Sequence, residues 1–242
     1  RYLCYTASVG TEKTALTIGL GHSAYENDYP YLGTNQKNEN GAFNNNAFDF
    51  AFGFLASESN IIKLYHHTFL GNRDFSGTLT APSNDNYRNY DSRSLLEWVN
   101  FKRNRIQRIR GAYLFERFRY YGNNATDDFS FGKSENFQVD YDYKFTLKNW
   151  TLNGIVTANN ISAEGSSIGG ATRNQLSAVV LVSHKPNDKL GYGINLRKDW
   201  VSDYDSPFVF SVDAKYAITK KYQIRGSASK NYRIPTFNDL YW

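Results

Sequence analysis

The sequence predicts an all-β protein in which the strands run up and down in one antiparallel sheet. Three observations lead to this prediction. Apolar and polar residues alternate with a period of two over many segments, for example 48–55, 137–145 and 208–219, and strand side chains point in turn to opposite faces of a sheet. Short and long connections alternate along the chain. One of the two faces of these segments is rich in charged residues.

The alternating segments divide the chain into about twelve strands. The alternation is weakest over 61–71 and 105–121, which leaves room for a β-bulge or a change of register there. The expected strands are 2–9, 14–24, 44–56, 61–71, 88–101, 105–121, 134–146, 149–160, 173–185, 189–200, 207–219 and 222–233.

The connections between these strands fall into two classes. The short ones have the turn-forming and charged composition of hairpins: 10–13, 57–60, 102–104, 148, 186–188 and 220–221. The long ones are rich in Asn, Gly, Asp, Ser and Tyr: 25–43, 72–87, 122–133, 161–172 and 201–206. In a meander, all the short turns therefore lie at one end and all the long loops at the other. This asymmetry is typical of outer-membrane barrels, which have short periplasmic turns and longer external loops.

The polar face also favours a transmembrane barrel. Soluble barrels fill their interior with apolar side chains, and a dry core cannot hold many unpaired charges. A wet or plugged lumen can hold them, and tilted spanning strands need about 9–11 residues, which these segments supply. The expected inward-facing side chains are Gln138, Asp140, Asp142, Lys144, Asn195, Arg197, Asp199, Ser211, Asp213, Lys215, Arg225, Ser227, Ser229 and Asn231.

Composition and charge argue against several other classes of protein. The net charge is +5, but Lys and Arg are scattered rather than gathered on one face, so we expect no nucleic-acid partner. The sequence contains no run of roughly 18 apolar residues, so it predicts no transmembrane helix. The single cysteine, Cys4, rules out an intramolecular disulfide and a multi-cysteine metal site.

The residues that could carry catalysis or bind a metal do not form a recognisable set. His66 and His67 are adjacent, so on a strand they face opposite sides and cannot bind the same metal ion. No Gly-x-Ser-x-Gly motif is present. The sequence therefore predicts no catalytic residue, no metal site and no cofactor.

The segment at the end of the chain carries the most specific motif. An alternating strand runs into Pro235, which lacks a backbone donor and ends the ladder. This segment resembles a hallmark of TonB-dependent outer-membrane receptors, in which an aromatic-Arg-x-Pro-Thr sequence is soon followed by Leu-Tyr. The stretches 67–77, 94–98 and 112–121 resemble barrels of the same family, especially its Bacteroidetes-type members. The matching motif residues are Tyr232, Arg233, Pro235, Thr236, Leu240 and Tyr241.

The resemblance implies a barrel of about 22 strands that is closed by an N-terminal plug domain. Residues 1–242 would then be part of the barrel domain of a TonB-dependent receptor, with the plug domain absent from this chain. About twelve strands make an incomplete barrel, so we expect the end strands, near Tyr2 and Tyr232, to remain as unpaired edges.

The function that the resemblance implies is transport rather than catalysis. The whole protein would lie in the bacterial outer membrane and import a large, scarce nutrient with energy from TonB. Metal-chelate receptors, such as those for cobalamin or ferric siderophores, fit the compact loops. The implied partners are the TonB complex, reached through the missing plug region, a small metal chelate or similar nutrient, and outer-membrane lipid, with no nucleic acid.

Six residues combine a position in a long loop or at the rim with chemistry suited to a ligand: Tyr29, Tyr31, Arg73, Tyr87, Tyr204 and Arg233. Aromatic side chains offer rigid apolar area with a polar tip. Each could equally be an ordinary loop residue or, for Arg233, a plug-facing residue.

Two other functions remain open at this point. A self-contained barrel of 12 strands could act as an outer-membrane channel or a barrel enzyme. A β-rich adhesin or surface domain would not need detergent for solubility.

Overall fold

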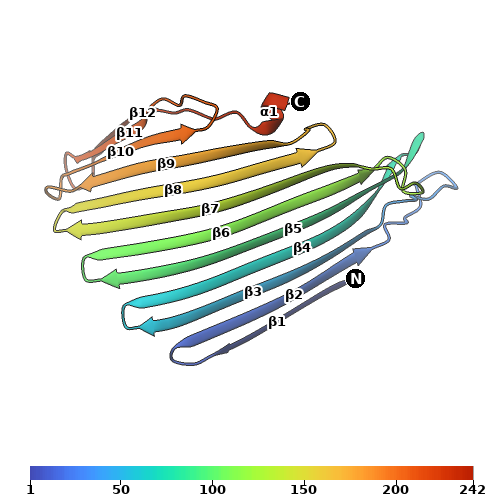
Figure 1. Ribbon diagram of the computed structural model, residues 1–242, viewed down its shortest axis with the longest axis horizontal. Coiled ribbons are helices and arrows are strands. Elements are labelled where there is room, and N and C mark those ends of the chain that lie inside the picture. Colours follow the sequence, from blue (N-terminus) through green and yellow to red (C-terminus); the bar gives the residue numbers. More distant parts are fainter. Residues whose placement is uncertain (242) are drawn as a thin grey trace.

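The computed structural model describes residues 1–241, with the backbone alone for Asn238 and Tyr241. Twelve strands form one antiparallel sheet in sequence order, and each strand pairs with the next (Figure 1). The predicted all-β meander is therefore confirmed. The strands are β1 (Tyr2–Gly10), β2 (Thr14–Tyr25), β3 (Phe43–Ser57), β4 (Asn60–Thr78), β5 (Ala81–Lys102), β6 (Arg105–Tyr121), β7 (Ser130–Leu147), β8 (Trp150–Gly165), β9 (Ala171–His184), β10 (Leu190–Val201), β11 (Val209–Ala217) and β12 (Gln223–Lys230), followed by the short helix α1 (Phe237–Tyr241).

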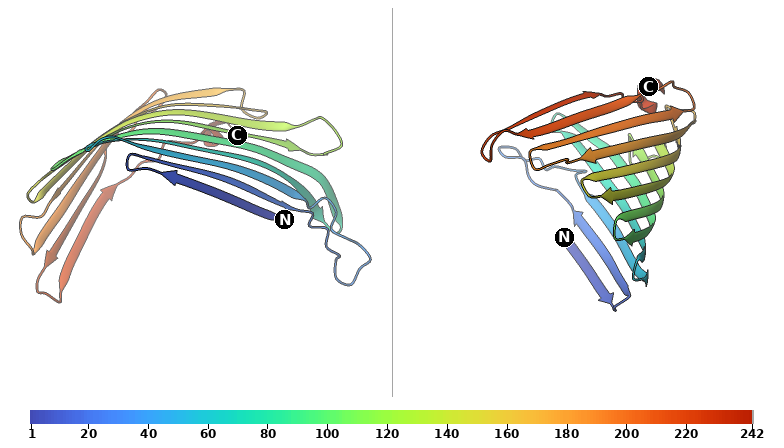
Figure 2. Two further views of the ribbon diagram at one scale, coloured as in Figure 1. Left: turned by 90° about the horizontal axis from the view of Figure 1, so that it is seen from below. Right: turned by 90° about the vertical axis from the view of Figure 1, so that its left-hand side faces the viewer.

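The sheet curves into an open trough, as both views in Figure 2 show. Within residues 1–241, β1 pairs with β2 alone and β12 pairs with β11 alone. The two outer strands thus keep free edges, and the sheet is an incomplete barrel, as expected. No helix in this part of the chain is long and apolar enough to cross a membrane.

The three longest connections, 26–42, 122–129 and 202–208, all lie at one end of the sheet (Figure 1). We call the end with the connections 11–13, 58–59, 103–104, 148–149, 185–189 and 218–222 the turn end. The opposite end, the loop end, holds 26–42, 79–80, 122–129, 166–170 and 202–208.

The predicted long loop 72–87 is wrong. β4 continues to Thr78 and β5 begins at Ala81, so only two residues connect them. The extra strand length is polar, so it lacks the hydrophobic alternation that marks the rest of each strand. Ladder hydrogen bonds and side-chain contacts hold it instead: the buried Asn86 donates from Nδ2 to Asn72 Oδ1 and Asp74 Oδ1, both at 2.6 Å.

The weak alternation over 61–71 and 105–121 suggests register shifts in those segments, but the shifts lie elsewhere. β6 pairs without interruption with both of its neighbours. The shifts fall between Leu55 and Ser57 and between Phe75 and Gly77. Gly77 has a φ of +71°, which a residue with a side chain rarely adopts, so this glycine allows the β4–β5 hairpin to bend.

The register separates the residues of the sheet into two faces. On the polar face, Glu97 lies opposite Arg110, and Arg110 lies opposite Asp140. One residue along each strand, the apolar face carries Trp98, Ile109 and Tyr141 in the same way. The predicted polar face is therefore confirmed.

The polar face is the more crowded of the two. Asp140 is only 6% exposed, whereas Leu96 on the apolar face is 54% exposed. Side chains crowd together on a concave surface and spread apart on a convex one, so the polar face lines the inside of the trough.

Apolar side chains do not form a central core in this sheet. Among the described residues, only Val99 and Tyr121 are buried hydrophobic side chains. Soluble proteins rarely leave so large an apolar face uncovered. Its burial must come from outside the chain, and lipid supplies this environment for a transmembrane barrel.

Aromatic side chains mark both margins of the apolar face. At the turn end Trp150 stacks on His184 with ring centroids 3.7 Å apart, and Tyr192 meets His184 edge-on. Trp200 lies on the same face near the loop end, opposite Leu176. Such belts are typical of membrane–water interfaces.

Candidate functional site

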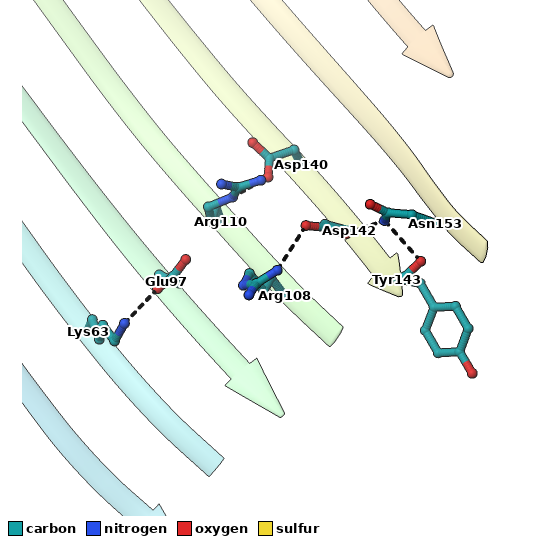
Figure 3. Close-up of polar contacts among 8 residues, drawn as sticks. All are labelled: Lys63, Glu97, Arg108, Arg110, Asp140, Asp142, Tyr143 and Asn153. Carbon is teal, nitrogen blue, oxygen red and sulfur yellow. Dashed lines mark hydrogen bonds and ion pairs between the residues drawn. The ribbon is translucent and has the colours of Figure 1, made fainter. Parts of the chain in front are cut away.

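A row of ion pairs crosses the polar face from β4 to β7 (Figure 3). Lys63 Nζ lies 3.3 Å from Glu97 Oε1, and Arg110 Nε donates to Asp140 Oδ2 at 2.6 Å. These side chains are directly opposite one another in the register, because cross-strand neighbours share a face. The charges of the lumen wall are thus satisfied largely within the wall.

A second set of contacts extends this row towards the turn end (Figure 3). Arg108 Nη1 donates to Asp142 Oδ2 at 3.2 Å. Asn153 Nδ2 donates to Asp142 Oδ1 at 2.6 Å and to the Tyr143 carbonyl at 3.2 Å. Since Asp142 is buried, these partners offset the cost of removing its carboxylate from water.

The motif segment after β12 folds into a capped helical turn. The strand stops earlier than predicted, because β12 ends at Lys230 and leaves Asn231 and Pro235 outside the sheet. Thr236 is the N-cap of α1. Thr236 N–H donates to Asp239 Oδ2 at 2.7 Å, and Asp239 N–H donates back to Thr236 Oγ1 at 3.2 Å. This reciprocal pair is a capping box, which satisfies two free donors at the start of a helix.

Asp239 also holds the motif arginine. Arg233 Nη2 lies 3.4 Å from Asp239 Oδ2, with 77% of the Arg233 side chain exposed. The hydrogen bonds from the backbone and hydroxyl of Thr236, and then the charge of Arg233, lower the pKa of the Asp239 carboxyl below its usual value. The carboxylate therefore stays ionised and keeps the segment folded into its turn.

Arg173 fastens this segment to the sheet. It extends from the polar face of β9 and is only 7% exposed. Its Nη1 donates to the Pro235 carbonyl at 2.9 Å. Its guanidinium lies 4.7 Å from the Phe237 ring centroid and 5.5 Å from that of Tyr204. Arg173 thus connects the predicted residue Tyr204 with the motif segment, and α1 lies over the polar face.

A hollow of about 680 Å³ lies at the loop end beside α1. Tyr87, Phe118 and Phe237 line it together with Thr236 and the loop residues 166–168. Tyr87 stacks on Phe118 with ring centroids 5.6 Å apart and an interplanar angle of 17°. The structure therefore brings the predicted residue Tyr87 and the motif residue Thr236 to one hollow.

Arg73 is a neighbour of this hollow. It lies opposite Tyr87 in the β4–β5 register, on the polar face. Its guanidinium lies 5.7 Å from the Phe75 ring centroid. Arg73 and Tyr87 are thus strand residues at the loop end, and not residues of a flexible loop.

Tyr29 and Tyr31 form a separate group in loop 26–42. Their rings meet edge-on with centroids 5.8 Å apart, and Tyr31 Oη donates to Asn38 Oδ1 at 3.0 Å. Asn40 ties the loop to the β4–β5 hairpin through its Nδ2, which contacts the carbonyls of Phe75, Ser83 and Asp85 at 2.9–3.1 Å. Among the described residues, no recorded contact joins this tyrosine pair to the hollow.

The other motif residues have more open surroundings. Tyr232 is 39% exposed and Leu240 is 38% exposed. Tyr241 ends α1, and its side chain lies outside the described part of the chain.

Sequence reasoning missed Arg173 and Asn40. Arg173 follows a long loop at a polar-face position, which is a signal that could have singled it out. Its partners are far away in sequence, with Pro235 62 residues further along. Asn40 gives no sequence signal, since the loop holds many asparagines.

The histidines behave as their spacing predicts. His66 contacts Ser94 and Thr68 on the apolar face, whereas His67 Nδ1 lies 2.7 Å from Asp49 on the polar face. In residues 1–241, no group of three or more His, Cys, Asp and Glu side chains is placed to hold a metal ion.

The chain is similar to a known family and to several solved structures. The family model described as TonB dependent receptor-like, beta-barrel matches residues 5–242. The siderophore receptor PirA from Pseudomonas aeruginosa shares 11% identity at a TM-score of 0.78, over 97% of this chain and 40% of that one. The FrpB iron transporter from Neisseria meningitidis shares 9% identity at a TM-score of 0.75, over 98% and 45%.

Two further structures show the range of cargo among similar barrels. The copper transporter OprC shares 12% identity at a TM-score of 0.72, over 98% of this chain and 43% of that one. The RagAB peptide importer shares 11% identity at a TM-score of 0.64, over 93% and 36%. No curated protein matches the sequence.

The chain spans less than half the length of these four structures. Their TM-scores show a shared fold, and at 9–12% identity the likeness shows the fold alone. The family model covers nearly the whole chain, so it shows the family. The chain belongs to the TonB-dependent receptors, a family of transport receptors whose β-barrels lie in the bacterial outer membrane.

Proposed function

We propose that the whole protein imports a large, scarce nutrient through the outer membrane with energy supplied by TonB, and that the nutrient is a metal chelate such as a ferric siderophore or cobalamin. The observation that carries this proposal is a pair of cationic and aromatic groups at two places of the loop end: Arg73 lies opposite Tyr87 on the polar face, and Arg173 contacts Tyr204 beside α1. Cationic and aromatic groups suit anionic, bulky chelates. Three of the structures similar to this chain are named for siderophore, iron or copper transport.

We propose further that residues 1–242 are part of a barrel of about 22 strands, which an N-terminal plug domain outside this chain closes. The free edges of β1 and β12 support this and count against a self-contained barrel of 12 strands. Four buried side-chain atoms have no partner among the described residues: Arg105 Nε, Asn136 Oδ1, Asn159 Oδ1 and Arg173 Nε. The last three lie on the polar face, where a plug would supply partners, and Arg105 lies on the apolar face at the turn end. The plug would also carry the contact with TonB.

Ligand binding by the full-length protein tests the nutrient class. The purified receptor is titrated calorimetrically with ferric siderophores, cobalamin, a copper chelate and a peptide. We expect one of the chelates to bind, and Arg73→Ala and Tyr87→Ala each to weaken that binding by about tenfold or more, a loss of about 1.4 kcal/mol. Tyr113→Ala, on the apolar face, is the matched control and should bind like wild type.

Uptake of the labelled chelate by cells with and without TonB tests the transport step. We expect uptake to require TonB. Binding of the peptide alone, or uptake that continues without TonB, would contradict the proposal.

A further inference from the structure

The apolar face carries an unexpected group of positive charges near the loop end. Arg88, Arg117 and Arg119 line a hollow of about 410 Å³ across β3 to β6, together with Tyr90 and the amides of Asn44 and Asn72. In the register, Asn72 lies opposite Arg88, and Arg88 lies opposite Arg119. This row is on the apolar face, several residues closer to the loop end than Leu64 and Leu96, which lie opposite each other.

Aromatic rings hold the three guanidinium groups in place. Arg88 Cζ lies 4.6 Å from the ring centroid of Tyr121, and Arg119 Cζ lies 4.8 Å from that of Phe129. Arg117 Cζ lies 6.0 Å from the Tyr90 ring centroid. A guanidinium that stacks on a ring keeps its N–H groups free at the edge of its plane.

The charge of this group is not neutralised within the described residues. Arg88 donates from Nε and Nη2 to the neutral amides of Asn86 and Asn124, at 2.9 and 3.3 Å. No ion pair of Arg88, Arg117 or Arg119 with a carboxylate is recorded in residues 1–241, and no acidic residue lines the hollow. The nearby Asp74 accepts a hydrogen bond from Asn86 instead.

The position of the hollow indicates what would bind there. The apolar face contacts lipid, and the loop end is the external end of an outer-membrane barrel. The hollow therefore lies where the headgroups of the outer leaflet begin. Arginine forks match phosphate oxygens in pairs of hydrogen bonds.

We propose that Arg88, Arg117 and Arg119 bind the phosphate-bearing headgroup of an outer-leaflet lipid against the outer wall of the barrel. A second hollow on the same face provides an internal comparison. It measures about 620 Å³ and is lined by Asn160, Asn174, Leu176 and Trp200 without any charged side chain. A phosphate-bearing headgroup should therefore bind in the first hollow and not in the second.

Native mass spectrometry of the full-length protein in detergent tests this proposal, with bisphosphorylated lipid A as the probe and its dephosphorylated form as the control lipid. We expect the bisphosphorylated lipid to be retained and the dephosphorylated form to be lost. The variant R88Q/R117Q/R119Q should retain at least tenfold less lipid. The variant R88K/R117K/R119K keeps the charges and should lose much less.

A matched control removes the same charge from the other face. R93Q/K144Q/K215Q changes three polar-face cations and should retain lipid like wild type. Heat-dependent migration in gels checks that every variant is folded. If the triple variant does not fold, the three single Arg→Gln variants replace it in the lipid-retention measurement. Equal retention of the dephosphorylated lipid, or an equal loss in the control variant, would overturn the assignment. Lipid retention is measured without any nutrient, so its result does not depend on the outcome of the transport test.

Discussion

The two faces of the β6–β7 pair share one backbone but differ in the charge and the exposure of their side chains. Arg110 and Asp140 form a hydrogen-bonded ion pair on the polar face. One residue away on each strand, Ile109 and Tyr141 lie opposite each other on the apolar face, 45% and 39% exposed. The Asp140 carboxylate is buried and paired, while the hydrophobic side chains are exposed, the reverse of a soluble protein. The comparison teaches that one period-two sequence encodes contact with two different surroundings, lipid outside and a polar lumen inside.

Removing one partner of a buried ion pair should have the largest effect. Arg110→Ala leaves the buried Asp140 carboxylate without its charged partner, so we expect a loss of about 3–5 kcal/mol in the free energy of unfolding. Urea unfolding of the full-length protein in bilayers measures this loss. Glu116→Ala is the control, because its pair with Arg93 is half exposed and should contribute less than about 1 kcal/mol. Equal losses would show that burial on the polar face does not matter.

A charge placed in turn on the two faces of β8 sharpens the comparison. Val156 lies on the apolar face and Thr157 on the polar face. We expect Val156→Arg to lower the free energy of unfolding by about 2–4 kcal/mol, the cost of a cation at the depth of the bilayer core. Thr157→Arg should lose much less, since its side chain enters the lumen. The same unfolding assay decides, and a larger loss for Thr157→Arg would reverse the assignment of the faces.

The contact between Arg173 and the motif segment extends the polar face beyond the sheet. Arg173→Met keeps the length of the side chain but loses the hydrogen bond to Pro235. A hydrogen bond from a charged group contributes about 2 kcal/mol, so amide exchange in the segment 236–241 should become roughly thirtyfold faster. Exchange in β8 serves as the reference and should not change. Unaltered exchange of the segment would mean that Arg173 does not hold it.

The smallest expected effect is on the capped turn at the rim. The folded pKa of Asp239 is below its usual value, so its contribution to the turn is fully present above the unfolded pKa and is lost as the pH falls through the folded pKa. Carboxylate titration by NMR of labelled protein should show this lowered pKa. Thr236→Val should bring it back towards the usual value, whereas Ser166→Ala, in the neighbouring loop, should not.

Much of the sheet could be predicted because local pattern decides it. The alternation of Phe48, Phe50 and Phe52 with Asp49 and Ala51 locates a strand and both of its faces. The same rule places His66 and His67 on opposite sides. The alternation of apolar and polar residues stops beyond Arg73, so the sequence predicts a loop where the β4–β5 hairpin continues.

The candidate site was less accessible from the sequence because it depends on contacts between distant segments. Arg73 and Tyr87 are neighbours through the β4–β5 register, and Tyr204 meets the motif segment only through Arg173. No local pattern encodes either contact. The Asp239 side of the capping box could have been found, since Thr236 and Asp239 have the spacing of that motif.

Spin-label accessibility along β8 tests the assignment of the two faces most directly. In a Cys4→Ser background of the full-length protein, single cysteines replace each of the residues 152–158 in turn, and each is spin-labelled in bilayers. We predict that collisions with oxygen, which concentrates in lipid, peak at Leu152, Val156 and Ala158 and fall at Asn153, Ile155 and Thr157. Accessibility without this alternation, or with maxima at the odd positions, would contradict the account of a barrel wall with lipid on one side and the lumen on the other.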